Sequence, residues 1–180
     1  MELELRGKVA LITGSSRGIG RSIAEALAAE GCHLMLTGRD EKALAEAAAA
    51  IVTLGATAKL HLADLRREEA PAALAAATER AYGRLDILVN NAGATKRGDF
   101  FELTEEDWAD GFALKFFGAV RLTRAAWPHL KEQSGSVVNI AGVGGRTPGP
   151  QFTIGGSVNA ALLSFTKALA DIGVRDGVQV

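Results

Sequence analysis

The stretch at residues 8–28 reads KVALITGSSRGIGRSIAEALA and combines an apolar run, a glycine-rich turn and an amphipathic segment. The apolar run at residues 9–13 is typical of a buried parallel strand, because such strands are covered on both faces. After the turn, Ile23, Leu27 and the alanines near them recur at helical spacing. This stretch therefore predicts a strand, a tight turn and a helix in immediate succession.

Three glycines of this turn predict a phosphate-binding site. Gly14 lets the chain leave the strand in a turn that a side chain would obstruct. Gly18 and Gly20 let the backbone approach a ligand and let the helix pack closely on its strand. The first amides of that helix lack internal partners and lie at the positive end of its dipole, so they suit a diphosphate. The alternative is a glycine-rich turn without a ligand, but a strand before it and a helix after it favour a dinucleotide site.

Two motifs resemble those of the short-chain dehydrogenase/reductase family. Residues 13–20, TGSSRGIG, are similar to its TGxxxGxG signature, and residues 90–93, NNAG, follow an apolar run as in that family. The resemblance covers the whole chain and implies a doubly wound, Rossmann-type α/β fold, with a parallel sheet and helices on both faces. It implies one dinucleotide-binding domain over residues 1–180. Family members continue with further strands, so we expect the C-terminal strands to be missing here. The chain is then either truncated or naturally short.

The end of the second predicted strand, residues 32–37, favours NADP(H) over NAD(H). An NAD-selective site carries an acid there for the ribose 2′-hydroxyl, whereas a cation accommodates the 2′-phosphate of NADP. Arg39 stands at that position, and the resemblance directs Arg17 to the same phosphate; the alternative is that both are solvated surface charges. By resemblance Asp64 and Leu65 contact the adenine, although Asp64 also fits as a loop acid before a helix. The expected cofactor-binding residues are Gly14, Ser16, Arg17, Gly18, Ile19, Gly20, Arg39, Asp64, Leu65, Asn91, Ala92 and Gly93.

The family's catalytic tetrad of Asn, Ser, Tyr and Lys is replaced in this sequence. In the family, the Lys lies one helical turn after the Tyr, where a cation favours the phenolate. By alignment with this pattern the four positions hold Lys115, Gly142, Gly155 and Asn159. The only tyrosine of the 180 residues, Tyr82, precedes the NNAG element, so no shift of alignment supplies a catalytic Tyr after it. The loss of general acid–base catalysis forfeits a factor of about 10²–10⁴ in rate.

Two hypotheses about function follow. In the first, the protein is an NADP(H)-dependent oxidoreductase that transfers a hydride between nicotinamide and a small carbonyl or alcohol substrate. Lys115 then supplies charge or a proton, with Thr153 or Ser157 as hydrogen-bond donor; the alternative for Lys115 is a surface or interface charge. In the second, the protein is a non-catalytic NADP(H)-binding relative with a regulatory or structural role.

Composition argues against several other classes of function. Twenty basic and 21 acidic residues are interspersed, so neither nucleic acid nor an acidic membrane surface is an expected partner. Cys32 is the single cysteine and the three histidines are isolated, so we expect no internal disulfide and no metal site. The uncharged residues 147–166 contain too many Pro, Gly and polar residues to form a membrane span. We expect a cytoplasmic protein, and the resemblance implies a homo-oligomer.

The rest of the chain alternates predicted strands and helices. Asp40 is the expected N-cap of one helix, and Thr104 with Asp107 resembles a capping box at the start of another. Gly155 and Gly156 are expected to interrupt the last helix early. Strands are expected over residues 57–62, 86–89, 136–140 and, incompletely, 177–180, and helices over residues 41–54, 68–82, 104–133 and 153–175.

Overall fold

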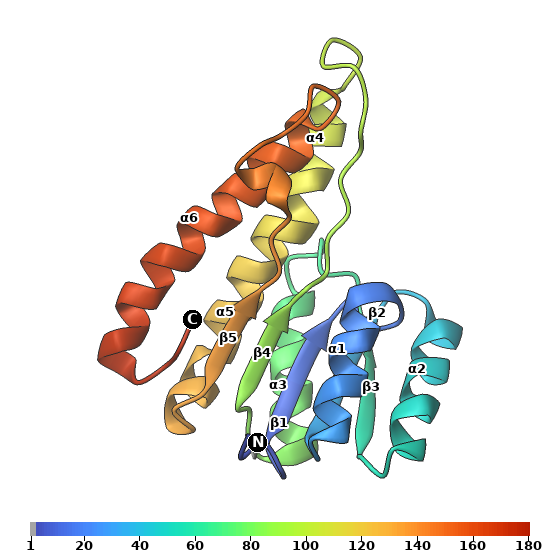
Figure 1. The fold of residues 1–180 in the computed structure, drawn as a ribbon, viewed down its shortest axis with the longest axis vertical. Coiled ribbons are helices and arrows are strands. Elements are labelled where there is room, and N and C mark those ends of the chain that lie inside the picture. Colours follow the sequence, from blue (N-terminus) through green and yellow to red (C-terminus); the bar gives the residue numbers. More distant parts are fainter. Residues whose placement is uncertain (1–2) are drawn as a thin grey trace.

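The computed structural model describes residues 3–180 and contains a parallel sheet covered by helices on both faces (Figure 1). The strands are β1 (Val9–Thr13), β2 (His33–Gly38), β3 (Ala58–Leu62), β4 (Ile87–Asn90) and β5 (Ser136–Asn139). The helices are α1 (Gly18–Ala29), α2 (Glu41–Thr53), α3 (Ala70–Tyr82), α4 (Glu105–Phe112), α5 (Gly118–Glu132) and α6 (Thr153–Asp176). A π-helical turn, η1 (Ala113–Phe117), joins α4 to α5, and a 3₁₀ turn, η2 (Val143–Gly145), follows β5.

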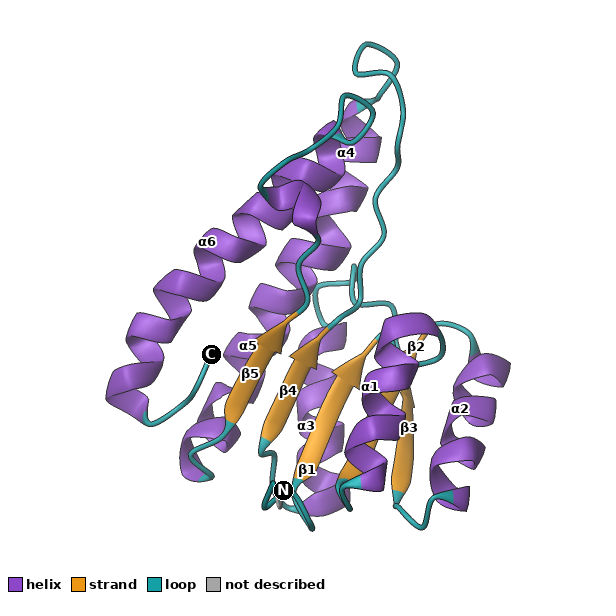
Figure 2. Ribbon diagram, in the orientation of Figure 1, coloured by secondary structure: helices purple, strands orange, loops and turns teal. Residues whose placement is uncertain are grey.

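The strand order β3-β2-β1-β4-β5 confirms the doubly wound topology (Figure 2). The chain moves outward from β1 through β2 to β3, and α3 then returns it to β4 on the other side of β1. All four strand pairings are parallel. In such sheets a crevice opens at the carboxyl ends of the strands where the winding direction reverses. Here that crevice lies between the loops after β1 and β4.

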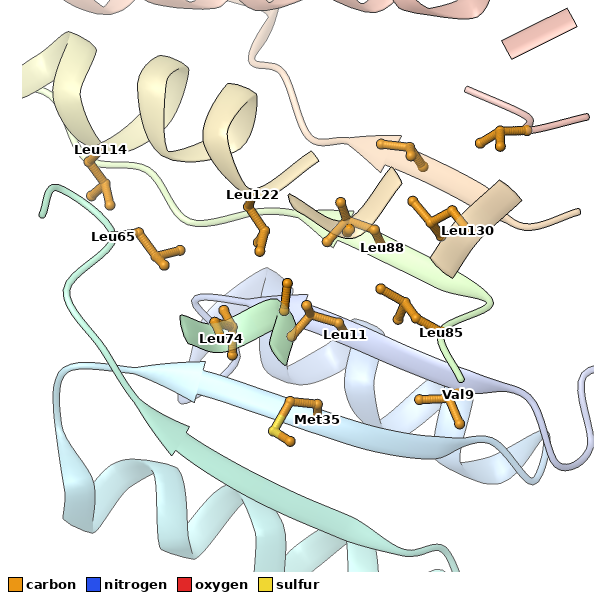
Figure 3. Packing of buried hydrophobic residues seen from close by; sticks show 14 residues of the cluster. Val9, Leu11, Met35, Leu65, Leu74, Leu85, Leu88, Leu114, Leu122 and Leu130 are labelled. Carbon is orange, nitrogen blue, oxygen red and sulfur yellow. The ribbon is translucent and has the colours of Figure 1, made fainter. Parts of the chain in front are cut away.

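Alternate residues of β1 pack on opposite faces of the sheet, as the period of a strand requires. Val9 and Leu11 join the core between the sheet and helices α3 and α5 (Figure 3). Ala10 and Ile12 join the core on the side of α1 and α2. Every residue of β1 is buried, because this strand is central and covered on both faces. The glycine turn therefore begins at the end of a central, fully buried strand.

Two helices differ from the sequence prediction. The expected helix over residues 104–133 is divided by the π-helical turn η1, which sequence reasoning did not anticipate. The last helix is not interrupted at Gly155 and Gly156; α6 is continuous, and both glycines are buried within it. The predicted capping box of Thr104 and Asp107 and the N-cap of α2 are confirmed.

The chain end and the cysteine complete the described structure. Gln179 forms a parallel bridge with Ser136 at the outer edge of β5, and residues 177–180 form no other strand pairing.

The buried thiol of Cys32 donates to the Leu5 carbonyl over 3.4 Å, and burial raises its pKa to about 11. Within residues 3–180 there is no cluster of three or more potential metal ligands. No helix in that range is both long and apolar enough to cross a membrane.

Candidate functional site

The turn between β1 and α1 adopts the backbone conformation that its glycines predict. Gly14 has a φ of 63° and Gly18 a φ of 57°, in the left-handed region that side chains disfavour. A Cβ on Gly20 would overlap the carbonyl oxygen of Gly14 and Nδ2 of Asn91, so this position needs glycine for close packing. No side chain among the described residues caps α1, which leaves its first amides available to an anion.

The NNAG element after β4 is held against this turn by the side chains of Thr13 and Asn91. Thr13 Oγ1 accepts hydrogen bonds from the amides of Asn91 and Ala92, both at 2.9 Å. Asn91 Nδ2 donates to the carbonyl oxygen of Thr13 over 2.9 Å and to that of Gly14 over 3.1 Å. The two motifs that are far apart in the sequence are therefore parts of one structure at the carboxyl edge of the sheet.

A cleft of about 470 Å³ opens between these motifs and the ends of β2 and β3. Gly18 and Gly20 do not line it; no atom lies within 4 Å of a Cβ built on Gly18, so only its φ requires glycine. Sequence reasoning did not anticipate that Gly38, Ala94 and Ile140 also line the cleft, although Gly38 and Ile140 lie at predicted strand ends and Ala94 follows the NNAG element. The predicted cofactor-binding residues that line it are Gly14, Ser16, Arg17, Ile19, Arg39, Asp64, Leu65, Asn91, Ala92 and Gly93.

Charged side chains gather at the end of the cleft beside β2 and β3. Arg39 Nη1 lies 3.7 Å from one carboxylate oxygen of Asp64, and Arg66 Nη1 lies 3.3 Å from the other. Arg66 also pairs with Asp110 of α4. Partial burial acts to raise the pKa of Asp64, but the hydrogen bonds from Arg66 and the charges of both arginines outweigh it and lower that pKa. Sequence reasoning missed Arg66, whose only signal is its place two residues after Asp64.

Three of the four positions aligned with the tetrad lie together and are joined by hydrogen bonds. Asn159 Oδ1 accepts from the amide of Gly142 over 2.6 Å, and its Nδ2 donates to the carbonyl of Gly155 over 2.7 Å. Both ends of the Asn159 amide are therefore bonded to backbone, and the residue is only 3% exposed. It connects the two glycine positions and lines neither cavity.

The ring of Phe152 fills the space beside Gly155. A Cβ on Gly155 would lie 2.7 Å from Cδ2 of this ring and would overlap its far edge. The guanidinium of Arg97 lies over the ring, 4.3 Å from its centroid. A Cβ on Gly144 would lie 2.7 Å from ring atoms Cδ1 and Cε1 of Phe152. Gly142 and Phe152 also line a second cavity of about 510 Å³. With the ring in this position, no side chain can project from residue 155.

Tyr82 has a structural role. Its hydroxyl donates to the carbonyl of Leu34 over 2.8 Å, and burial raises its pKa to about 12. It lines neither the cleft nor the second cavity.

Lys115 lies in η1, and its side chain enters the cleft across Gly93. A Cβ on Gly93 would lie 2.8 Å from Cδ of this lysine and 3.3 Å from its Nζ. The absence of a side chain at residue 93 therefore leaves room for the lysine side chain to enter the cleft. The side chain is half-buried, and among residues 3–180 no carboxylate oxygen lies within 4.0 Å of Nζ. Burial lowers the pKa of this ammonium group. The structure thus places Lys115 in the cleft and not on the open surface.

A parallel sheet with a glycine turn at its switch point defines a Rossmann-type dinucleotide-binding fold. A family model described as short chain dehydrogenase matches residues 8–180, and the chain belongs to the short-chain dehydrogenase/reductase family of oxidoreductases.

Relatives of known sequence or structure resemble the chain over nearly its whole length. An uncharacterized oxidoreductase of Staphylococcus saprophyticus is 36% identical over 99% of this chain and 77% of its own length. The L-sorbose reductase of Gluconobacter frateurii, solved with NADPH and L-sorbose, superposes with a TM-score of 0.96 at 34% identity, over 99% of this chain and 68% of that one. An NAD⁺-bound xylitol dehydrogenase superposes with a TM-score of 0.94 at 27% identity, over 98% of this chain and 69% of that one. The chain spans from 57% to 77% of the length of three curated relatives that it matches.

Proposed function

We propose that this chain binds a nicotinamide dinucleotide along the cleft, with NADP(H) preferred over NAD(H). The uncapped amides of α1 would hold the diphosphate, and Gly14 keeps the turn free of side chains there. Asp64 and Leu65 would contact the adenine, and the NNAG backbone would line the nicotinamide end. The solved relatives carry either NADPH or NAD⁺, so the class of cofactor is supported by the family and the preference by residues of this chain.

The cation cluster at the end of β2 supports the preference for NADP(H). Arg17 and Arg39 line the cleft, and Arg66, which pairs with Asp64, adds a third guanidinium beside it. The nearest acid in sequence, Asp40, also lines the cleft, but its carboxylate accepts from the Ala43 amide over 3.0 Å as the N-cap of α2. A 2′-phosphate would meet positive charge there, whereas the two acids that line this end, Asp40 and Asp64, already have protein partners.

We further propose that the chain is a binding member of the family that does not carry out the family's proton transfer. A bound dinucleotide supplies the hydride or accepts it, but reduction of a carbonyl also needs a proton at its oxygen. The observation that carries this proposal is the Phe152 ring, which fills the space where a tyrosine at residue 155 would begin. Asn159 adds to it, since both ends of its amide are bonded to backbone.

The position of Lys115 favours a second candidate, an oxidoreductase with a rearranged site. Its ammonium is the one titratable lysine group lining the cleft, and burial lowers its pKa. A lysine whose pKa moves toward neutrality can give a proton to a developing alkoxide. Thr153 offers no added support, because it does not line the cleft that Lys115 enters.

Calorimetric titration with NADPH and NADH tests the binding proposal. We expect NADPH to bind at least about tenfold more tightly than NADH, and Arg39→Ala to remove most of that difference, because charge-assisted phosphate contacts are worth about 1.5–3 kcal/mol. Arg67→Ala is the matched control, since Arg67 is exposed, pairs with Glu69 and lies outside the cleft. Absence of binding by both nucleotides would contradict the proposal.

Oxidation of NADPH in the presence of small ketones, aldehydes and sugars tests the catalytic question. We expect no turnover above the rate without protein. Turnover that Lys115→Ala abolishes would instead support the second candidate. Turnover that persists in Lys115→Ala would contradict both accounts of the site.

A further inference from the structure

The cleft has two chemically different ends. Arg39 and Asp64 lie at the ends of β2 and β3, whereas Gly93 and Lys115 lie beyond the end of β4. A dinucleotide whose diphosphate lies at α1 and whose 2′-phosphate lies at Arg39 extends its nicotinamide across the switch point to the second end. This placement rests on the proposed binding of NADP(H).

The second end carries one cation that is not neutralised. Lys115 Nζ lies across Gly93 within the wall of the cleft, with no carboxylate oxygen within 4.0 Å among residues 3–180. Leu114 and Ile140 also line the cleft and contribute apolar surface to it. Because this side chain is half-buried, water screens its charge less than at an exposed position. Burial also lowers the pKa of its ammonium, in keeping with a partly desolvated charge.

The two redox forms of the dinucleotide differ in charge only at the nicotinamide. The oxidised ring is a pyridinium cation and the reduced ring is neutral, while the phosphates, riboses and adenine are the same in both. Any interaction at the Arg39 end therefore contributes equally to the affinities of the two forms. A cation at the nicotinamide end repels the oxidised form alone.

We propose that Lys115 makes the site selective for the reduced dinucleotide, so that the chain binds NADPH in preference to NADP⁺ and its occupancy reports the redox state of the nucleotide pool. Selectivity arises because electrostatic repulsion weakens the oxidised complex and leaves the reduced one untouched. The glycine at residue 93 is part of this arrangement, since any side chain there would displace the lysine stem.

Titration calorimetry of the whole chain with NADPH and with NADP⁺ tests the proposal. We expect the Kd of NADP⁺ to exceed that of NADPH by at least about tenfold, which raises the potential of the bound couple by about 30 mV. Lys115→Gln should bring the two Kd values to within about threefold of each other by tightening NADP⁺, and Lys115→Arg should preserve the difference, because it keeps the charge. Lys42→Gln is the control for a change of net charge, since Lys42 is exposed at the start of α2 and lies outside the cleft wall.

The outcomes separate the inference from the function on which it rests. Failure of both forms to bind would overturn the proposed function and the inference with it. Binding of both forms with equal Kd would overturn the inference alone. So would a preference for NADPH that Lys115→Gln leaves unchanged, in a variant whose circular dichroism matches that of the unmodified chain.

Discussion

Replacing Gly155 with Ala should destabilise the protein through the ring of Phe152. The new Cβ would lie 2.7 Å from Cδ2 and would overlap the far edge of the ring, so either the ring or α6 must move. The ring cannot move freely, because Arg97 lies over one face and Gly144 is in close contact. Overpacking costs about 1–3 kcal/mol and alanine in a helix returns at most about 1 kcal/mol, so the free energy of unfolding should fall by about 0–2 kcal/mol.

A double-mutant cycle with Phe152→Ala isolates this contact, because the helix propensity of alanine is the same in both backgrounds. Without the ring, Gly155→Ala should stabilise the chain by up to about 1 kcal/mol, giving an interaction free energy of about 1–3 kcal/mol between the two positions. Urea denaturation followed by circular dichroism measures all four proteins. Gly149→Ala is the control, since no atom lies within 4 Å of its Cβ position. Additivity within about 0.5 kcal/mol would refute the placement of the ring against Gly155.

Gly20→Ala should lower the free energy of unfolding by about 1–2 kcal/mol in urea, because its Cβ would overlap backbone, whereas Gly149→Ala should not. Thr13→Val should cost about 1–3 kcal/mol in the same assay, since it leaves two amides without their acceptor. Burial raises the pKa of Asp86, but Arg84 and other donors outweigh it and the net shift is downward. The stability that Asp86 contributes is therefore complete above the unfolded pKa of about 3.9 and lost as pH falls through the lower folded pKa. Asp86→Asn should therefore reduce the fall in Tm that the unmodified chain shows as pH is lowered through this range. An unchanged dependence of Tm on pH would contradict this role of Asp86.

The strand, turn and helix at the start of the chain could be predicted because each depends on local chemistry. An apolar run, a glycine turn and helical spacing each leave a mark within a few residues. The doubly wound parallel sheet was predicted from the family resemblance, and the structure confirms it. The assignment of single residues to the cofactor stays a prediction, although the cleft collects most of them.

The features that escaped prediction depend on contacts between distant residues. The hydrogen bonds from Asn91 to Thr13 and Gly14 join segments 77 and 78 positions apart. Nothing near Phe152 in the sequence indicates that its ring fills the space beside Gly155, since this depends on how the loop after β5 meets α6. Gly155 and Gly156 were expected to break the helix, but tertiary packing overrides propensity where a side chain would not fit.

The π-helical turn η1 has a consequence for the evolution and engineering of this region. Each residue of an α-helix rotates the chain by about 100°, so the extra residue offsets the faces of α4 and α5 by roughly that angle. With this offset, Gly111 abuts Ile154 while Gly118 abuts the Leu65 backbone. Deleting a single residue from 113–117 would turn one helix against its neighbours, so this junction should accept substitutions far more readily than changes in length.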